Sequence, residues 1–519
     1  MKLDFQTYRD KVMGCWAGKN IGGVLGAPFE GKRQLNEVDF YTQDLTMGPP
    51  PNDDLDLQIV FLAAVERYGR NVNASILGEY WLSYIIPNWV EYGQGKANLR
   101  CGLTPPMSGY VDNEYRNSCG CFIRSELWAC LCPGQPELAA RYAYEDGIVD
   151  HAGEGVYGEV FFASMQSAAF VESDPQALLR VGLSYIPADC AVARAVRQAM
   201  DCHRQGVSLP EARRRIHNAA PGTFGIQGVA LDELPQAGNE GMEIGAPGFD
   251  APENVAFAVA GWLYGQGDFG QSLCAANAFG EDTDCTCASL GATLGIVLGA
   301  SRLPERWTAP LGDQIATLCI DKTSGGVWVP KTVTELTERV LRVTPLFLGV
   351  ELCDLLAPGG YAILCREGEG LLAREGDRYL PRINGGGKDQ RLTAAQKCAL
   401  SPFVTIHEFP AFTVYVDRMG SASFRQGQPR SFRVRVVSSH TQCRQEWVRI
   451  RLFLPKGVCA DSAEELLLPL NNLWKAYAEA VFTVNADELT AAKLECLVDV
   501  SLEGRHSNGQ VKLVLYREA

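Results

Sequence analysis

The sequence predicts a mainly helical domain over residues 1–345, followed by an antiparallel β-sandwich over residues 346–519. Before residue 345, apolar residues recur every three to four positions in stretches rich in Ala, Gly and Leu, which is helical spacing. After it, short segments alternate between apolar and polar residues, as strands do. A chain of 519 residues is also long enough for two or three domains.

Helical periodicity is clearest in residues 139–143 and 160–169. A further helix is predicted over residues 210–216, because its first residue is a proline, which suits the first helical turn. The predicted strands cover residues 412–416, 432–437, 448–454, 494–502 and 511–516. Gly, Pro, Asn or Asp residues separate these strands, and residues 384–387 (NGGG) are predicted to form a flexible loop. Several short strands of this kind favour a sandwich.

Glycines recur at every fourth position in two ladders, Gly14, Gly18, Gly22, Gly26 and Gly291, Gly295, Gly299. On a helix this spacing gives a smooth stripe, against which another backbone can pack closely. Glycine costs about 1 kcal/mol per helix position relative to alanine, so close packing is expected to compensate. The first ladder is alternatively the place where its helix ends.

Charge and cysteine usage exclude several classes of protein. The chain has 47 basic and 61 acidic residues, a net charge of −14, which argues against nucleic acid as a partner. Its 18 cysteines lack the spacing of zinc ligands, and residues 1–5 lack the apolar core of a signal peptide. Reduced thiols and a cytoplasmic location are therefore expected. The uncharged run over residues 285–301 is too short for a membrane span, so no membrane association is expected.

The first acidic cluster, residues 52–56 (NDDLD), follows three prolines that end any preceding helix. Residues 57–65 are predicted to be helical. Asn52 would then be the N-cap, with Asp53 and Asp54 in the first turn, where the helix dipole favours acidic side chains. This structural explanation and a role in metal binding both remain open for the cluster.

The second acidic cluster, residues 281–284 (EDTD), precedes another predicted helix over residues 288–300, so the helix dipole again offers an explanation. Carboxylates this close raise each other's pKa unless a cation lies between them. Clusters that offer only oxygen ligands suit Mg²⁺, Mn²⁺ or Ca²⁺ rather than zinc. We hypothesise that the two clusters converge to hold two ions.

Four motifs, in this order along the chain, resemble the ADP-ribosylglycohydrolase family: residues 14–30 (GCWAGKNIGGVLGAPFE), residues 52–54 (NDD), His151 and residues 280–291 (GEDTDCTCASLG). The resemblance covers roughly residues 8–340 and leaves the C-terminal strands outside the family's minimal pattern. It implies an all-α orthogonal fold with a binuclear Mg²⁺ or Mn²⁺ centre. It also implies a cleft where the ribose hydroxyls of a small-molecule or ADP-ribosylated substrate meet the metals.

Motif by motif, the resemblance implies that Asn52, Asp53 and Asp54 are metal ligands from the first cluster. Asp282 and Asp284 look like the ligands from the second cluster. Many members carry Thr at the position of Asn52, and asparagine keeps an oxygen donor there. They also carry Thr where this chain has Cys285, and a thiol is a poor ligand for a hard cation. Either Cys285 does not bind the metal, or its backbone or a water replaces the hydroxyl.

Glu30 matches a glutamate that lies at the cleft in several members of the family. Glu30 or Asp54 is the expected acid/base group, and Asp56 is a further candidate.

His151 matches a histidine near the family's substrate site, although a single histidine is also common as a satisfied core residue. Asn117 and Arg124 lie in a polar, glycine-bearing segment that we expect near the mouth of the cleft. Arg124 would pair either with a substrate phosphate or with a structural carboxylate.

The expected function is metal-dependent hydrolysis of a glycosidic bond in an ADP-ribosylated or ribosyl-type substrate. Two alternatives remain: a glycosidase for a nucleoside or another sugar, and a catalytically silent protein that binds its ligand through the metals. Residues 153–158 and 265–270 have the glycine spacing of a dinucleotide-binding loop. The first lacks a buried strand before it, and the segment before the second is either helix or strand, so an oxidoreductase is disfavoured. The sequence does not specify the oligomeric state.

Overall fold

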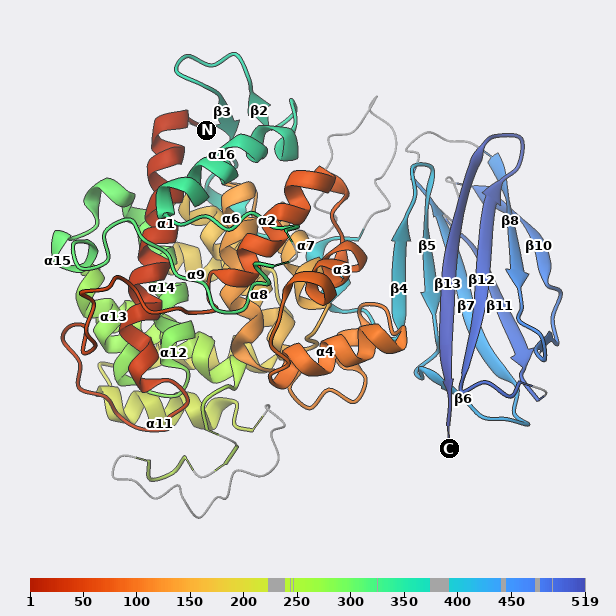
Figure 1. The fold of residues 1–519 in the computed structure, drawn as a ribbon, viewed down its shortest axis with the longest axis horizontal. Coiled ribbons are helices and arrows are strands. Elements are labelled where there is room, and N and C mark those ends of the chain that lie inside the picture. The colour runs from red at the N-terminus through yellow and green to blue at the C-terminus, as the bar shows by residue number, and fades with distance from the viewer. Residues whose placement is uncertain are drawn as a thin grey trace. The chain divides into compact units, whose positions relative to one another are not determined.

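The computed structural model describes residues 1–222, 239–242, 244–245, 247–323, 325–373, 392–439, 445–471, 477–487 and 489–518. The chain forms two compact units, of which the first comprises Met1–Ala97 and Ser108–Glu375 and the second comprises Asn98–Met107 and Gly376–Ala519. Figure 1 shows that the first is mostly helical and the second is built of strands.

Residues beyond 345 contribute to the first unit through a small antiparallel sheet. Its strands are β1 (Lys2–Leu3), β2 (Cys353–Asp354) and β3 (Ala362–Leu364), with β3 in the middle. The compact helical unit therefore extends to Glu375, whereas a domain boundary at residue 345 stays a prediction.

The α-helices follow one another along the chain as α1 (Phe5–Gly26), α2 (Asp56–Tyr68), α3 (Ala74–Tyr84), α4 (Val90–Cys101), α5 (Met107–Tyr110), α6 (Ser125–Leu131), α7 (Pro136–Gly147), α8 (Glu154–Ala169), α9 (Pro175–Ser184), α10 (Ala191–Arg204), α11 (Leu209–Ala219), α12 (Ala251–Tyr264), α13 (Phe269–Ala278), α14 (Thr283–Leu298), α15 (Glu305–Thr308), α16 (Val333–Leu348) and α17 (Ala394–Cys398). Short 3₁₀ turns include η1 (Ala27–Phe29) and η3 (Cys119–Arg124). The three predicted helical segments lie in α7, α8 and α11, which confirms them. Within the described residues, no helix is both long enough and apolar enough to cross a membrane.

The two glycine ladders pack against each other, because α1 and α14 run side by side (Figure 1). A Cβ atom on Gly18 would overlap the carbonyl oxygen of Gly291, and one on Gly14 would overlap that of Gly295. The predicted close packing is thus confirmed, and the ladders prove to be partners. Helix α1 also ends at Gly26, the last glycine of the first ladder, so the alternative expectation for this ladder is confirmed as well.

The second unit contains two five-stranded sheets, ordered β10-β8-β12-β13-β6 and β4-β5-β7-β11-β9. The pairs are antiparallel except for β13 with β6. The strands are β4 (Val404–Glu408), β5 (Phe412–Asp417), β6 (Ser423–Phe424), β7 (Arg430–Ser438), β8 (Gln445–Phe453), β9 (Cys459–Ala460), β10 (Glu465–Asn471), β11 (Tyr477–Asn485), β12 (Lys493–Leu502) and β13 (Ser507–Arg517).

All five predicted strands correspond to strands of these sheets: β5, β7, β8, β12 and β13. Alternate residues of the strands are buried, and the buried side chains of both sheets form one hydrophobic cluster. The predicted antiparallel, strand-rich C-terminal region is therefore confirmed. The loop predicted over residues 384–387 lies outside the described residues.

Candidate metal centre

The C-terminal half of α1 forms the surface against which both acidic clusters lie. A Cβ atom on Gly23 would lie 2.9 Å from Oδ2 of Asp54, in the first cluster. A Cβ atom on Gly26 would overlap the backbone of Thr283 and Asp284, in the second cluster. The absence of side chains at these two glycines lets both clusters approach the same helix, so the C-terminal glycines of α1 help to position the site.

The first cluster forms a turn ahead of α2. The Oδ1 atom of Asn52 accepts a hydrogen bond of 2.7 Å from the backbone N–H of Asp54. Helix α2 begins at Asp56, and its N-cap is Leu55, which makes no side-chain capping bond. The prediction that Asn52 caps this helix is therefore wrong, because the Asn52 side chain closes a local turn on Asp54 instead.

A hydrogen bond joins the two clusters directly, since Nδ2 of Asn52 donates to Oδ2 of Asp284 over 3.3 Å. In the second cluster Asp282 caps α14, with its carboxylate 3.4 Å from the N–H of Cys285, as its predicted place at a helix start implied. The Glu30 carboxylate, which follows η1, lies within 4.8 Å of those of Asp282 and Asp284. Residues from three distant parts of the sequence thus meet at one point.

Burial and the negative charges of neighbouring carboxylates raise the pKa values of this acidic group. Asp54 is only 3% exposed, and neither of its oxygens has a hydrogen-bond partner among the described residues. Burial raises its pKa to about 7, while the positive charge of Lys19 lowers it and the charge of Asp53 raises it. Burial, followed by the negative charges of Asp282 and Asp53, raises the pKa of Glu30 to about 8. The buried, unpartnered carboxylate of Asp54, with further carboxylates close by, fits a hard divalent cation such as Mg²⁺ or Mn²⁺.

The metal-free protein should lose stability as the pH rises. The folded state holds protons on Asp54 up to about pH 7 and on Glu30 up to about pH 8, whereas the unfolded chain releases them near the ordinary values of 3.8 and 4.5. The folded state therefore binds more protons in this interval, so the free energy of unfolding falls from about pH 4 to about pH 8. Urea unfolding at several pH values checks this. Asp54→Asn should flatten the slope, and an unchanged slope in that variant would contradict the assignment.

Two further predicted acidic residues make other contacts. The Oδ2 atom of Asp53 accepts a hydrogen bond of 2.9 Å from the hydroxyl of Tyr92. Asp56 is fully buried and accepts hydrogen bonds from the backbone N–H groups of Leu318 and Cys319. Asp56 therefore anchors the segment that carries Leu318, and it is not one of the residues grouped with Glu30, Asp282 and Asp284.

The three residues predicted to bind substrate, Asn117, Arg124 and His151, make hydrogen bonds or ion pairs with other groups of the protein. Arg124 is fully buried, with Nε 2.9 Å from Asp146 and Nη2 2.8 Å from Asp150. These ion pairs agree with the structural-carboxylate alternative for Arg124. His151 is also buried, with Nε2 2.8 Å from the hydroxyl of Ser118 and Nδ1 3.0 Å from Asp150.

The side-chain oxygen of Asn117 accepts a hydrogen bond of 3.1 Å from the backbone N–H of Glu154, at the start of α8. This group of contacts touches the metal centre through the next residues of the chain, because Cys119 donates a hydrogen bond to Oδ2 of Asp282. Asn117 and His151 therefore hold the segment that supplies Cys119.

The family model of the ADP-ribosylglycohydrolases matches residues 4–343, which include every candidate site residue. The chain belongs to the ADP-ribosylglycohydrolase family. Among solved structures, one titled "ADP-ribosylglycohydrolase-related protein complex" is similar, with 17% identity and a TM-score of 0.43, over 66% of this chain and 99% of that one. The curated proteins contain no match to this sequence.

Sequence reasoning missed several residues of this family member that lie next to the candidate metal ligands. Lys19 is fully buried in α1, and its Nζ lies 3.2 Å from the Glu126 carboxylate. A lysine inside a glycine ladder was the available signal, because an apolar stripe rarely carries a charge without a partner. Cys119 and Tyr92 gave no comparable signal, since only the fold brings them to the two acidic clusters. Glu281 belongs to a different group, with ion pairs to Arg33 and Arg213.

Proposed function

We propose that this chain is a divalent-metal-dependent hydrolase that cleaves the glycosidic bond of an ADP-ribosylated or ribosyl-type substrate. Membership of the ADP-ribosylglycohydrolase family supports glycosidic hydrolysis. The observation that supports metal dependence is the meeting of Asn52 with Asp284 beside Asp54, whose buried oxygens have no hydrogen-bond partner among the described residues.

In this proposal the carboxylates of Asp54, Asp282 and Asp284 hold two ions, Mg²⁺ or Mn²⁺, with Asp53 and Asn52 beside them. Bound ions supply charge stabilisation and a template for vicinal hydroxyls of the sugar. Lys19 and Tyr92 keep the carboxylates of the first cluster in place, since Lys19 raises the positive potential at Asp54 and Tyr92 bonds to Asp53.

Glu30 is the proposed acid/base residue. Glu30 reaches the surface, whereas Asp282 and Asp284 are buried, and its carboxylate is only partly desolvated, so it can contact a water and the substrate. Its raised pKa, which results first from burial and then from the charge of Asp282, lets it hold or release a proton near neutral pH. Glu30→Gln should therefore reduce turnover while metal binding through the three aspartates persists.

The proposal includes a reducing compartment such as the cytoplasm, because the buried thiols of Cys119 and Cys285 lie beside the acidic group. The substrate is a small molecule or an ADP-ribosylated one.

Hydrolysis assays with ADP-ribosyl-arginine, ADP-ribosyl-serine, nucleosides and aryl glycosides test the function. We expect turnover of one ribosyl compound, loss of that turnover in EDTA, and recovery on addition of Mn²⁺ or Mg²⁺. Turnover that EDTA does not affect would contradict metal dependence. Metal-dependent ligand binding without turnover of any compound would show a catalytically silent protein.

Removal of the metal should also lower stability. A ligand that binds only the folded state at one hundred times its dissociation constant stabilises that state by about 2.7 kcal/mol. We therefore expect EDTA to lower the melting temperature and Mn²⁺ to restore it. Asp54→Asn should melt at the same temperature with and without Mn²⁺. A melting temperature of the wild type that does not respond to either treatment would argue against a metal at this site.

A further inference from the structure

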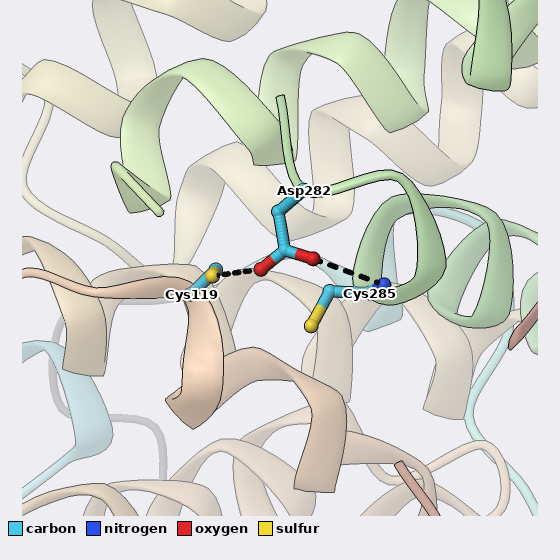
Figure 2. Close-up of side chains that lie close together, drawn as sticks. All are labelled: Cys119, Asp282 and Cys285. Atoms are coloured by element: carbon cyan, nitrogen blue, oxygen red, sulfur yellow. Dashed lines mark hydrogen bonds between the residues drawn. The ribbon is translucent and has the colours of Figure 1, made fainter. Parts of the chain in front are cut away.

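The carboxylate of Asp282 lies between the thiols of two cysteines, Cys119 and Cys285. Cys119 is the first residue of η3, and Cys285 lies in the first turn of α14. Figure 2 shows the Asp282 carboxylate between the two cysteines, with one oxygen bonded to the Cys119 thiol and the other to the backbone N–H of Cys285. All three side chains are buried.

The three potential ligand atoms lie close enough together to share a single ion. The two Sγ atoms and a carboxylate oxygen of Asp282 lie within 4.8 Å of one another. In a tetrahedral zinc site the Zn–S bonds are about 2.3 Å and the Zn–O bonds about 2.1 Å long, which puts neighbouring ligands roughly 3.5–3.8 Å apart. The three ligand atoms are therefore near enough to share one ion after side-chain adjustment, in which the Cys119 thiol and the Asp282 oxygen move apart from their hydrogen-bonded contact.

The ligand types select a different cation from the neighbouring acidic group. Glu30, Asp282 and Asp284 offer only oxygens, which suit a hard cation, whereas a pair of thiols selects zinc and other thiophilic ions. A thiol pair alone does not make such a site. Cys15 and Cys130 share a thiol hydrogen bond, but they are not part of a cluster of three potential metal ligands within the described residues.

We propose that Cys119, Cys285 and one oxygen of Asp282 bind a thiophilic divalent cation, with zinc as the physiological candidate. Each thiol loses its proton to solvent when the ion binds. Asp282 belongs to both groups, so occupation of the thiol site is coupled to that of the carboxylate site. The inference adds a site to the proposed function and does not depend on hydrolytic activity.

Cobalt titration of the reduced, EDTA-treated full-length protein tests this inference, because Co²⁺ bound to thiolates gives a sulfur-to-metal charge-transfer absorption. We expect one equivalent of Co²⁺ to produce this absorption and zinc to displace it. Cys119→Ser and Cys285→Ser should each reduce this absorption, because one thiolate is lost, and should weaken zinc binding by roughly tenfold to a hundredfold or more. Cys285→Thr provides a second variant at the same position, in case serine there prevents folding.

Cys287→Ser is the matched control. Cys287 is a buried cysteine of the same helix, and its thiol donates to the carbonyl of Leu273 instead of to a carboxylate. This variant should keep the charge-transfer absorption. The proposal is overturned if the wild type shows no such absorption, or if the absorption is undiminished in either folded variant at position 119 or 285.

The same samples separate this inference from the proposed function. Electron paramagnetic resonance of added Mn²⁺ reports on the carboxylate site without using the thiols, and the hydrolysis assays report on turnover. A protein that hydrolyses a ribosyl compound without thiolate-bound cobalt would overturn only the thiol site. A protein that binds cobalt through both thiols but hydrolyses nothing would overturn only the hydrolase.

Discussion

Replacing Asp282 with alanine is expected to abolish divalent-metal binding and turnover together. Asp282 is the carboxylate common to both potential metal-binding groups, and its negative charge helps to raise the pKa values of Asp54 and Asp284. Changes to residues that only orient a metal ligand typically cost tenfold to a hundredfold in affinity, so loss of the ligand itself should cost roughly a hundredfold or more. Calorimetric titration with Mn²⁺ and the hydrolysis rate measure the two losses.

Loss of the helix cap at Asp282 needs its own control, because an N-cap contributes about 1 kcal/mol to stability. Asp268 caps the neighbouring helix α13 through a bond of 2.7 Å to the N–H of Gln271, and it lies on the surface. Asp268→Ala should lose a similar capping contribution while keeping metal affinity and turnover. If Asp282→Ala instead cleaves substrate at the wild-type rate without metal, the proposed chemistry is wrong.

A valine at Gly18 is expected to cause the largest loss of stability among changes away from the acidic residues. Its Cβ would overlap the carbonyl of Gly291, and backbone atoms cannot move aside as a side chain can. Helices α1 and α14 would have to separate. Overpacking of this kind costs about 3 kcal/mol at the upper end of its usual range. The separation should also weaken Mn²⁺ binding, because α1 supports one cluster and α14 carries the other.

Ala17→Val provides the matched control for this prediction. Ala17 is the preceding residue of α1 and is half-buried, so Ala17→Val places the same β-branched side chain in the same helix turn without entering the ladder. Thermal unfolding and Mn²⁺ titration of both variants measure the difference. Equal melting temperatures for the two variants would show that the glycine contact does not limit the packing of α1 on α14.

The sequence predicted that each glycine ladder packs closely against another backbone, but it did not predict that the two ladders pack against each other. Spacing of four residues indicates a smooth helical stripe, and this property is local to each helix. Which stripe packs on which follows from the fold, where Gly14 meets Gly295 and Gly18 meets Gly291. The β-strands were easier to predict, because alternation of buried and exposed residues repeats within each strand. The family match supports the helical fold and glycosidic hydrolysis that the motifs implied.

The acidic clusters show how far local signals extend. Asp282 does cap α14, as a helix start predicts, and this role alone would explain the residue. Asp54 precedes the N-cap of α2, so helix capping does not explain its buried carboxylate. The hydrogen bond from Asn52 to Asp284 depends on the packing of α1 against α14, which no local pattern contains. The buried ion pairs of Arg124 likewise become visible only once η3 and α7 are in place.

The most direct test of the account is the anomalous scattering of Mn²⁺ in a crystal of the full chain. We expect anomalous peaks next to the carboxylates of Asp54, Asp282 and Asp284, between the loop before α2 and the start of α14. Manganese peaks that lie elsewhere, with the Asp54 carboxylate facing no ion, would contradict the claim that the two clusters share divalent cations.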